Sequence, residues 1–290
     1  MAENTKIQWC DHTFNPWIGC TKVQEGCLNC YAEELMANRY QRVEWGPKGT
    51  RSRTKTWNQP KKWNKQSGKL ALDTLYDTPG LWDDQAASLG EKRKVFCASL
   101  ADVFEAKDEV TPWRADLFNL IDECQNLHWL LLTKRPQHIL QMWPQPLKRR
   151  ENVWLGTSIA VQKNVDVYIP LLLKSRELCR YLFLSVEPQV GFIDLNKYLF
   201  PKPLVDWVII GGESKQGKSE PRPYDILWAR TLLAQCRAAG VPCFIKQFGS
   251  IVYDDGRRMH FEDGHGGNME EWPEDLRVRE CPETYHRVAA

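Results

Sequence analysis

Short apolar runs that end abruptly in polar residues recur through the middle of the chain. They are rich in β-branched and aromatic side chains, and stretches with helical periodicity separate them. Their apolar character is continuous rather than alternating, which is typical of parallel strands buried on both faces. We predict strands at 94–99, 128–133, 153–158, 181–185, 206–211 and 243–246.

The segments between these runs carry the signals of helices. Thr111 and Pro112 supply an N-cap and a first-position proline, and Asp225 caps a second helix that stops at Gly240. The strand starts lie roughly 25 to 35 residues apart, which is the span of one βα unit. With an early strand predicted at 7–11, the pattern indicates an α/β fold: a partial or full (β/α) barrel with parallel strands over residues 1–250.

A barrel of this kind carries its functional groups just past the carboxyl ends of its strands. Plain salt bridges among strand ends are the competing explanation for polar residues at these places. The candidate site residues there are Ser99, Asp102, Lys134, Arg135, Thr157, Ser158, Glu187, Gly211, Gly212, Glu213 and Lys246.

Three cysteines, Cys20, Cys27 and Cys30, lie within eleven residues in the stretch GCTKVQEGCLNCY. A structural zinc site requires four protein ligands, and Cys10 or His12 is a candidate for the fourth. An iron–sulfur cluster is held by thiolates, and three of them leave one iron open to a substrate or cofactor. Because the motif lies between the first predicted strand and a helix predicted at 31–42, we expect it at the mouth of the barrel.

The overall composition is that of a soluble globular protein, with 42% hydrophobic and 26% charged residues among 290. No apolar run is long enough to cross a bilayer, and the first residues lack the apolar core of a signal peptide. We therefore expect a cytoplasmic protein with no membrane partner. Thiols stay reduced in the cytoplasm, so the ten cysteines are not interpreted as a disulfide framework.

Charge is unevenly distributed. Residues 41–70 hold nine Lys or Arg, one acid and the tryptophans Trp45, Trp57 and Trp63. This combination suits a nucleic acid, with cations for phosphates and aromatic rings for bases, although a solvated basic loop has the same composition. Residues 251–290 hold ten acids and five arginines, and we interpret them as an acidic C-terminal extension.

An ordered set of motifs covers nearly the whole chain and resembles one family. The motifs are TFNPWIGCTKVQEGCLNCYAE, SLADVFE, LLTKRP, VWLGTS, FLSVEP, WVIIGGES and FIKQFG. Together they resemble the three-cysteine (CX6CX2C) family of phages and prophages, which is classed with the radical SAM superfamily. The commonest superfamily motif has three residues in the first gap, so the six found here are a departure. Asn29 also replaces the aromatic residue that usually precedes the last cysteine.

The resemblance implies a [4Fe-4S] cluster on Cys20, Cys27 and Cys30 that cleaves S-adenosylmethionine (SAM) and starts hydrogen abstraction from a substrate. It also implies an electron donor protein as a partner. Because the Gly-Gly-Glu motif follows a late strand instead of the second one, roles are assigned by position. The SAM contacts are then Tyr31 for adenine, Ser99 and Asp102 for the amino group, Lys134 or Arg135 for the carboxylate, Thr157 and Ser158 for the ribose, and Gly211 and Gly212 for close backbone approach.

Glu187, Glu213 and Lys246 are assigned to the substrate side as catalytic residues. The leading substrate is a DNA base or a nucleotide, bound in part through residues 41–70. The alternative hypothesis is a zinc-stabilised nucleic-acid-binding protein with no catalytic activity.

Overall fold

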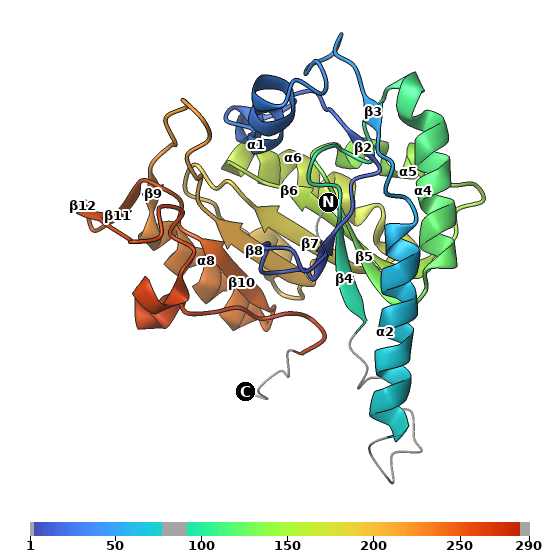
Figure 1. Ribbon diagram of the computed structural model, residues 1–290. Helices are drawn as coiled ribbons and strands as arrows, with labels where there is room; N and C mark the ends of the chain where they lie inside the picture. Colours follow the sequence, from blue (N-terminus) through green and yellow to red (C-terminus); the bar gives the residue numbers. More distant parts are fainter. Residues whose placement is uncertain (1–2, 77–91, 285–290) are drawn as a thin grey trace.

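The computed structural model describes residues 3–76 and 92–284, and its centre is a curled, all-parallel sheet (Figure 1). The strand order is β1-β4-β5-β6-β7-β8-β10, so each strand lies beside its neighbour in the chain, as in a barrel that is only partly closed. The strands are β1 (His12–Thr13), β4 (Arg93–Cys97), β5 (Leu127–Thr133), β6 (Arg150–Ser158), β7 (Cys179–Val186), β8 (Trp207–Gly211) and β10 (Cys243–Gln247). The predicted parallel partial barrel is therefore confirmed.

The helices cover the outer face of this sheet. They are α2 (Gln59–Tyr76), α4 (Thr111–Glu123), α5 (Ile139–Met142), α6 (Gln162–Leu173), α7 (Asn196–Leu199) and α8 (Ile226–Ala239). The Asp225 side chain accepts a hydrogen bond from Leu227 N at the start of α8, and Gly240 ends that helix in the left-handed conformation, as predicted. Short 3-10 turns lie at Glu25–Cys27, Asp108–Val110, Pro136–His138, Arg176–Leu178, Met269–Glu271 and Glu274–Leu276.

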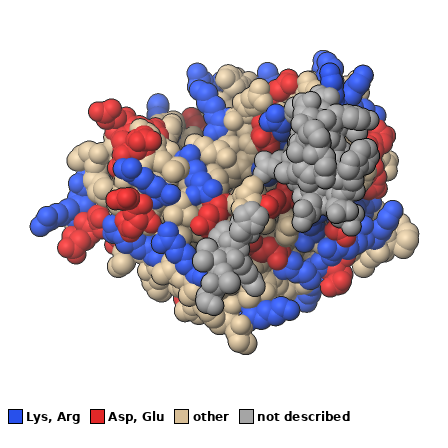
Figure 2. All heavy atoms as spheres, turned by 90° about the horizontal axis from the view of Figure 1, so that it is seen from below, with Lys and Arg blue, Asp and Glu red and all other residues tan. Residues whose placement is uncertain are grey.

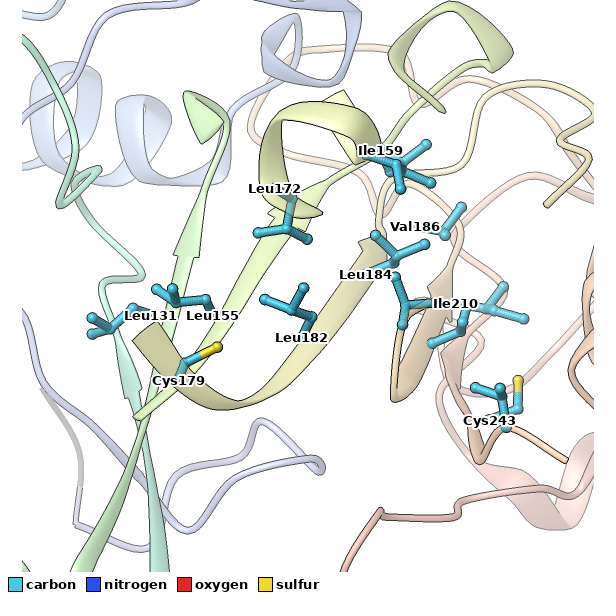
Figure 3. Close-up of a cluster of buried hydrophobic side chains, with 14 of the residues drawn as sticks. Leu131, Leu155, Ile159, Leu172, Cys179, Leu182, Leu184, Val186, Ile210 and Cys243 are labelled. Carbon is cyan, nitrogen blue, oxygen red and sulfur yellow. The ribbon is translucent and has the colours of Figure 1, made fainter. Parts of the chain in front are cut away.

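The continuous apolarity of the strands has a direct structural cause, because alternate residues enter two different cores. Leu131, Leu155 and Leu182 face the helices and pack with Leu172 of α6 (Figure 3). Their neighbours Leu130, Trp154 and Phe183 point to the other face, into the hollow of the half-barrel. An aromatic cluster fills the base of that hollow, formed by Trp9, Phe96, Trp154, Phe183, Trp207 and Phe244.

Two local predictions near the N-terminus are wrong. The early strand is not at 7–11 but is the two-residue β1, because Trp9 and Cys10 turn into the interior aromatic cluster instead of pairing with β4. The helix predicted at 31–42 begins at Tyr31 as α1 (Tyr31–Glu33) and continues as a π-helix that ends at Arg39.

The basic segment 41–70 contributes to the fold more than its composition suggested. β2 (Trp17–Ile18) pairs with β3 (Ser52–Arg53), and α2 then lies beside α4 (Figure 1). Trp63 is fully buried and stacks on His12 with ring centroids 4.3 Å apart, whereas Trp57 packs edge-on against Phe14. Trp63 is therefore not available for stacking on bases, contrary to the nucleic-acid interpretation, whereas Trp57 is partly buried and has Arg53 Cζ 4.2 Å from its ring centroid.

The C-terminal residues form a small sheet and then run along the edge of the half-barrel. β9 (Tyr224–Asp225), β11 (Val252–Asp254) and β12 (Arg257–Met259) make that sheet. Further on, Ile245 N donates to Val278 O, and Glu280 N donates to Cys243 O, which covers the edge of β10. Trp272, Leu276 and Val278 join the main core, so this acidic extension shares the core of the barrel.

Charge on the surface is mixed. Figure 2 shows Lys or Arg and Asp or Glu interspersed on the face opposite the cysteine-bearing end of the sheet. Within residues 3–76 and 92–284, no helix combines the length and the apolar character that crossing a bilayer requires.

Candidate functional site

The carboxyl ends of the strands surround one cavity of about 590 Å³. Ser99 and Asp102 follow β4, Lys134 follows β5, and Ser158 ends β6. The ends of β7, β8 and β10 and the cysteine loop form further parts of the wall. Of the predicted site residues, the cavity is lined by Cys20, Cys27, Cys30, Tyr31, Ser99, Asp102, Lys134, Ser158, Glu187, Gly212, Glu213 and Lys246. The topology of a parallel half-barrel thus brings residues distant in sequence to one site.

The three cysteines are free thiols on the wall of this cavity. Burial raises the pKa of Cys20 to about 12, although the guanidinium of Arg135 opposes this shift. Burial also raises the pKa of Cys30. The two thiols are therefore protonated at neutral pH in the metal-free chain, and ligation would require them to lose their protons.

Cys20 is fixed by a buried network of ion pairs. Gly19 turns the chain with a φ of 109°, and a Cβ there would lie 2.7 Å from Thr50 O. Arg135 Nη1 then donates to Cys20 Sγ at 3.5 Å, and its Nη2 donates to Thr21 O at 2.7 Å. Arg51 Nη2 donates to Thr21 Oγ1 at 2.9 Å. Both guanidinium groups therefore tie the start of the cysteine loop to the sheet.

Asp102 and Glu105 balance the charge of these two arginines. Glu105 receives two 2.7 Å hydrogen bonds from Arg51, and Asp102 receives one of 2.8 Å from Arg135. Asp102 also accepts from Thr133 Oγ1 and from the backbone N–H groups of Phe104 and Lys134. Burial would raise the pKa of Asp102, but these donors outweigh it and hold the pKa below its usual value. Asp102 lines the cavity, but both of its carboxylate oxygens already accept hydrogen bonds from protein groups.

The six-residue gap between Cys20 and Cys27 runs along successive strand ends. It starts at Arg135 after β5, and Gln24 Nε2 next donates to Ser158 O at the end of β6 at 3.3 Å. Gly26 then packs beside Ala160 and Pro188, which follow β6 and β7. Asn29 finally reaches Glu213 after β8. The length of the gap allows it to pass the ends of β5, β6 and β7, and Asn29 in the Cys27–Cys30 turn then contacts the residue that follows the end of β8.

Two cationic groups have different surroundings in the cavity. Lys246 Nζ forms a hydrogen-bonded ion pair with Glu187 Oε1. Lys134 Nζ donates to Ser158 Oγ at 3.1 Å, and within the described residues it has no carboxylate partner. A lone ammonium group near Cys30 in a cavity favours an anionic ligand.

Three predicted residues do not line the cavity. Thr157 is fully buried and donates to Thr133 O at 2.9 Å, so it joins two strands. Arg135 lies in the ion-pair network behind Cys20. Gly211 lies behind Glu187, whose Cγ would be 3.2 Å from a Cβ at this position.

Sequence reasoning missed part of the wall. Ser185 and Gln247 are at strand ends, where the polar pattern could have indicated them. Trp9 belongs to the segment 7–11, predicted as a strand, and His265 belongs to the C-terminal extension. Asn29 is the most informative of the missed residues, because its amide contacts Glu213 across the mouth. Only the replacement of the usual aromatic residue marked that position in the sequence.

The family assignment follows from a comparison with family models. The model described as protein of unknown function (DUF5131) matches residues 4–275, which spans every strand and all three cysteines. The chain belongs to the DUF5131 family. A search of the curated proteins and a search of the solved structures gave no match.

In this DUF5131 chain, the described residues contain no group of three or more His, Cys, Asp or Glu side chains arranged to hold a metal ion. The two candidates for a fourth zinc ligand lie away from the cavity. Cys10 Sγ donates to Ile7 O, and His12 stacks on Trp63. The thiols of Cys20, Cys27 and Cys30 thus share the cavity wall, but in the metal-free chain they are not gathered into such a group.

Proposed function

We propose that this DUF5131 chain is a radical SAM enzyme that holds a [4Fe-4S] cluster on Cys20, Cys27 and Cys30. The observation that carries the proposal is that these three thiols line one cavity at the carboxyl ends of a parallel half-barrel. A tetrahedral zinc site would need a fourth protein ligand, whereas a cluster with three thiolates has an open iron. The donor chemistry of the cavity wall fits such a cluster.

The cluster would supply the electron that cleaves SAM and thereby starts hydrogen abstraction. The chain's own residues bind and orient the reactants. Lys134 offers the unpaired ammonium group for the SAM carboxylate, with Ser158 beside it, and Ser99 and Tyr31 line the same part of the cavity. Arg135 holds Cys20 through a hydrogen bond to its sulfur. Asp102 accepts hydrogen bonds from the guanidinium of Arg135 and from the backbone N–H of Lys134, and so holds both residues in place.

The ion pair of Glu187 and Lys246 is the candidate for handling protons on the substrate, because both side chains line the cavity. We further propose that the substrate is a nucleic acid base or a nucleotide. The support is the row of exposed lysines on α2, Lys62, Lys65 and Lys69, because phosphate groups attract such cations. An electron donor protein would be a transient partner.

Anaerobic purification decides the main claim. Iron, sulfide and zinc are measured per chain, and 5′-deoxyadenosine is measured after reduction with SAM present. We expect Cys20→Ala, Cys27→Ala and Cys30→Ala each to lose the iron. The matched control is Cys236→Ala, which removes a buried thiol between α8 and the sheet and leaves the iron content unchanged. A colourless protein that carries zinc and forms no 5′-deoxyadenosine would overturn the proposal in favour of the zinc-stabilised binding protein.

Replacing Lys134 tests the cofactor contact separately. Lys134→Met removes a charge-assisted hydrogen bond of about 1.5–3 kcal/mol, so the Kd for SAM rises by roughly 10- to 150-fold. Lys134→Arg keeps the charge and serves as the control. Iron content is measured in both variants, and equal SAM affinity in Lys134→Met and the parent would exclude this residue as the carboxylate contact.

A further inference from the structure

The Cys27–Cys30 turn is tied to the opposite side of the cavity by one buried carboxylate. We propose that Glu213, Asn29 and Arg222 form a clamp that positions this turn, and that Glu213 is a positioning residue and not a catalytic one. The importance of the turn rests on the proposed function, but the clamp is a property of the polypeptide without any cofactor.

The hydrogen bonds of Glu213 leave little capacity for a ligand. Its Oε2 accepts from Asn29 Nδ2, Arg222 N and Arg222 Nε, each at 2.9 Å, and its Oε1 accepts from Arg222 Nη2. Glu213 is only 5% exposed. Burial would raise the pKa of Glu213, but these hydrogen bonds outweigh it and keep the pKa below its usual value. The carboxylate therefore stays ionised and occupied.

Arg222 and Asn29 attach the cysteine loop to the segment after β8 at points on both sides of Cys27. Arg222 Nη1 donates to Glu25 O at 2.9 Å, which precedes the turn. Asn29 lies within the turn, and its Nδ2 also donates to Glu220 O at 3.0 Å. The loop is thus held at two points by residues that follow β8, about 190 positions away in the sequence.

The backbone of Glu213 is itself firmly placed. Ser250 N donates to Glu213 O at 3.0 Å, and Gly212 N donates to Gln247 O at 2.9 Å. A Cβ at Gly212 would lie 2.0 Å from Phe248 O, so the close approach of these two segments requires glycine. The Gly-Gly-Glu motif therefore places a carboxylate at the end of β8, where it contacts the cysteine loop.

A reciprocal exchange tests the clamp. Asn29→Asp places a second carboxylate against Glu213, so that two negative charges repel. Glu213→Gln replaces one accepting oxygen by an amide N–H₂, which then faces the donor groups of Asn29 or Arg222. The double variant Asn29→Asp/Glu213→Gln again has one carboxylate, one amide and the guanidinium of Arg222. The control is Glu220→Gln, because Glu220 contributes only its backbone carbonyl to Asn29.

The first readout is the rate at which iodoacetamide labels Cys27 and Cys30 in the metal-free protein, followed by peptide mass spectrometry. We expect each single variant to raise this rate about tenfold, the double variant to return to within about threefold of the parent, and Glu220→Gln to match the parent. Cys20, which is held by Arg135, serves as the internal reference and keeps its rate.

The second readout is the electron paramagnetic resonance spectrum of the reconstituted, reduced cluster. We expect the single variants to broaden it and the double variant to restore it. Parental labelling in folded single variants, or faster labelling that the double variant does not reverse, would overturn the clamp. A protein that binds no iron but shows the expected labelling pattern would overturn the proposed function and leave the clamp standing.

Discussion

Replacing Arg51 with methionine removes one half of a buried ion pair. The Arg51 side chain is 0% exposed and that of Glu105 is 4% exposed, and two hydrogen bonds of 2.7 Å join them. Without Arg51, the cation that remains beside the Glu105 carboxylate is Arg135, whose Nη2 lies 3.5 Å from Glu105 Oε1. That Nη2 already donates a hydrogen bond to Thr21 O. Because a buried carboxylate is left poorly compensated, we expect the free energy of unfolding to fall by about 3–5 kcal/mol.

Urea denaturation followed by circular dichroism measures this change. The control is Lys61→Met, which breaks an ion pair with Glu123 whose side chains are 52% and 55% exposed, and it should leave the free energy of unfolding nearly unchanged because solvent screens such pairs. The double variant Arg51→Met/Glu105→Leu removes both charges and should recover part of the loss. A cost below about 1 kcal/mol for Arg51→Met, or no recovery in the double variant, would refute the reasoning.

Three further predictions concern other regions. Burial lowers the pKa of His12 from its usual 6.5, so the unfolded chain binds the proton more readily than the folded one. The protein should therefore lose stability as the pH falls below about 6.5. Thermal unfolding measured between pH 7.5 and 5 should show a smaller drop in the melting temperature for His12→Gln than for the parent. Gly212→Ala should lower the unfolding midpoint in urea, whereas Gly211→Ala, with 3.2 Å to the flexible Glu187 side chain, should change it little. Lys62, Lys65 and Lys69 on α2 are replaced by alanine together, and DNA binding is titrated at several salt concentrations. The variant should bind DNA more weakly, and the slope of log affinity against log salt concentration should fall in magnitude by about 2–3. An unchanged slope would exclude α2 as the contact.

The central sheet was predictable because its signal is local and strong. Strands buried on both faces read as unbroken apolar runs, and Leu130 and Leu131 illustrate why, since each enters a different core. The end of α8 before Gly240 follows from capping chemistry. The predicted N-cap of α4 is wrong by one residue: Val110 is the N-cap and makes no side-chain hydrogen bond, and Thr111 is the first helical residue. Most of the candidate residues just past these strands line the cavity.

Other features depend on contacts that a single sequence does not reveal. Trp9 and Cys10 form an apolar stretch like that of a strand, but they fill the interior of the half-barrel. The basic, tryptophan-rich segment has the same composition whether its rings face solvent or, as with Trp63, the core. Asn29 and Glu213 are 184 residues apart, so their hydrogen bond could not be inferred from spacing.

The half-barrel does not close on itself, and two segments outside the sheet complete the wall of its cavity. Ile7 and Gln8 come from the N-terminal segment, and Asp263 and His265 come from the C-terminal extension. Neither segment carries a cysteine of the loop or a hydrogen bond between the seven parallel strands. Substitutions there are expected to reshape the cavity while the cysteine-bearing loop stays intact. Family members that differ at these positions are therefore expected to accept different ligands, which makes the two segments the natural place to alter selectivity by design.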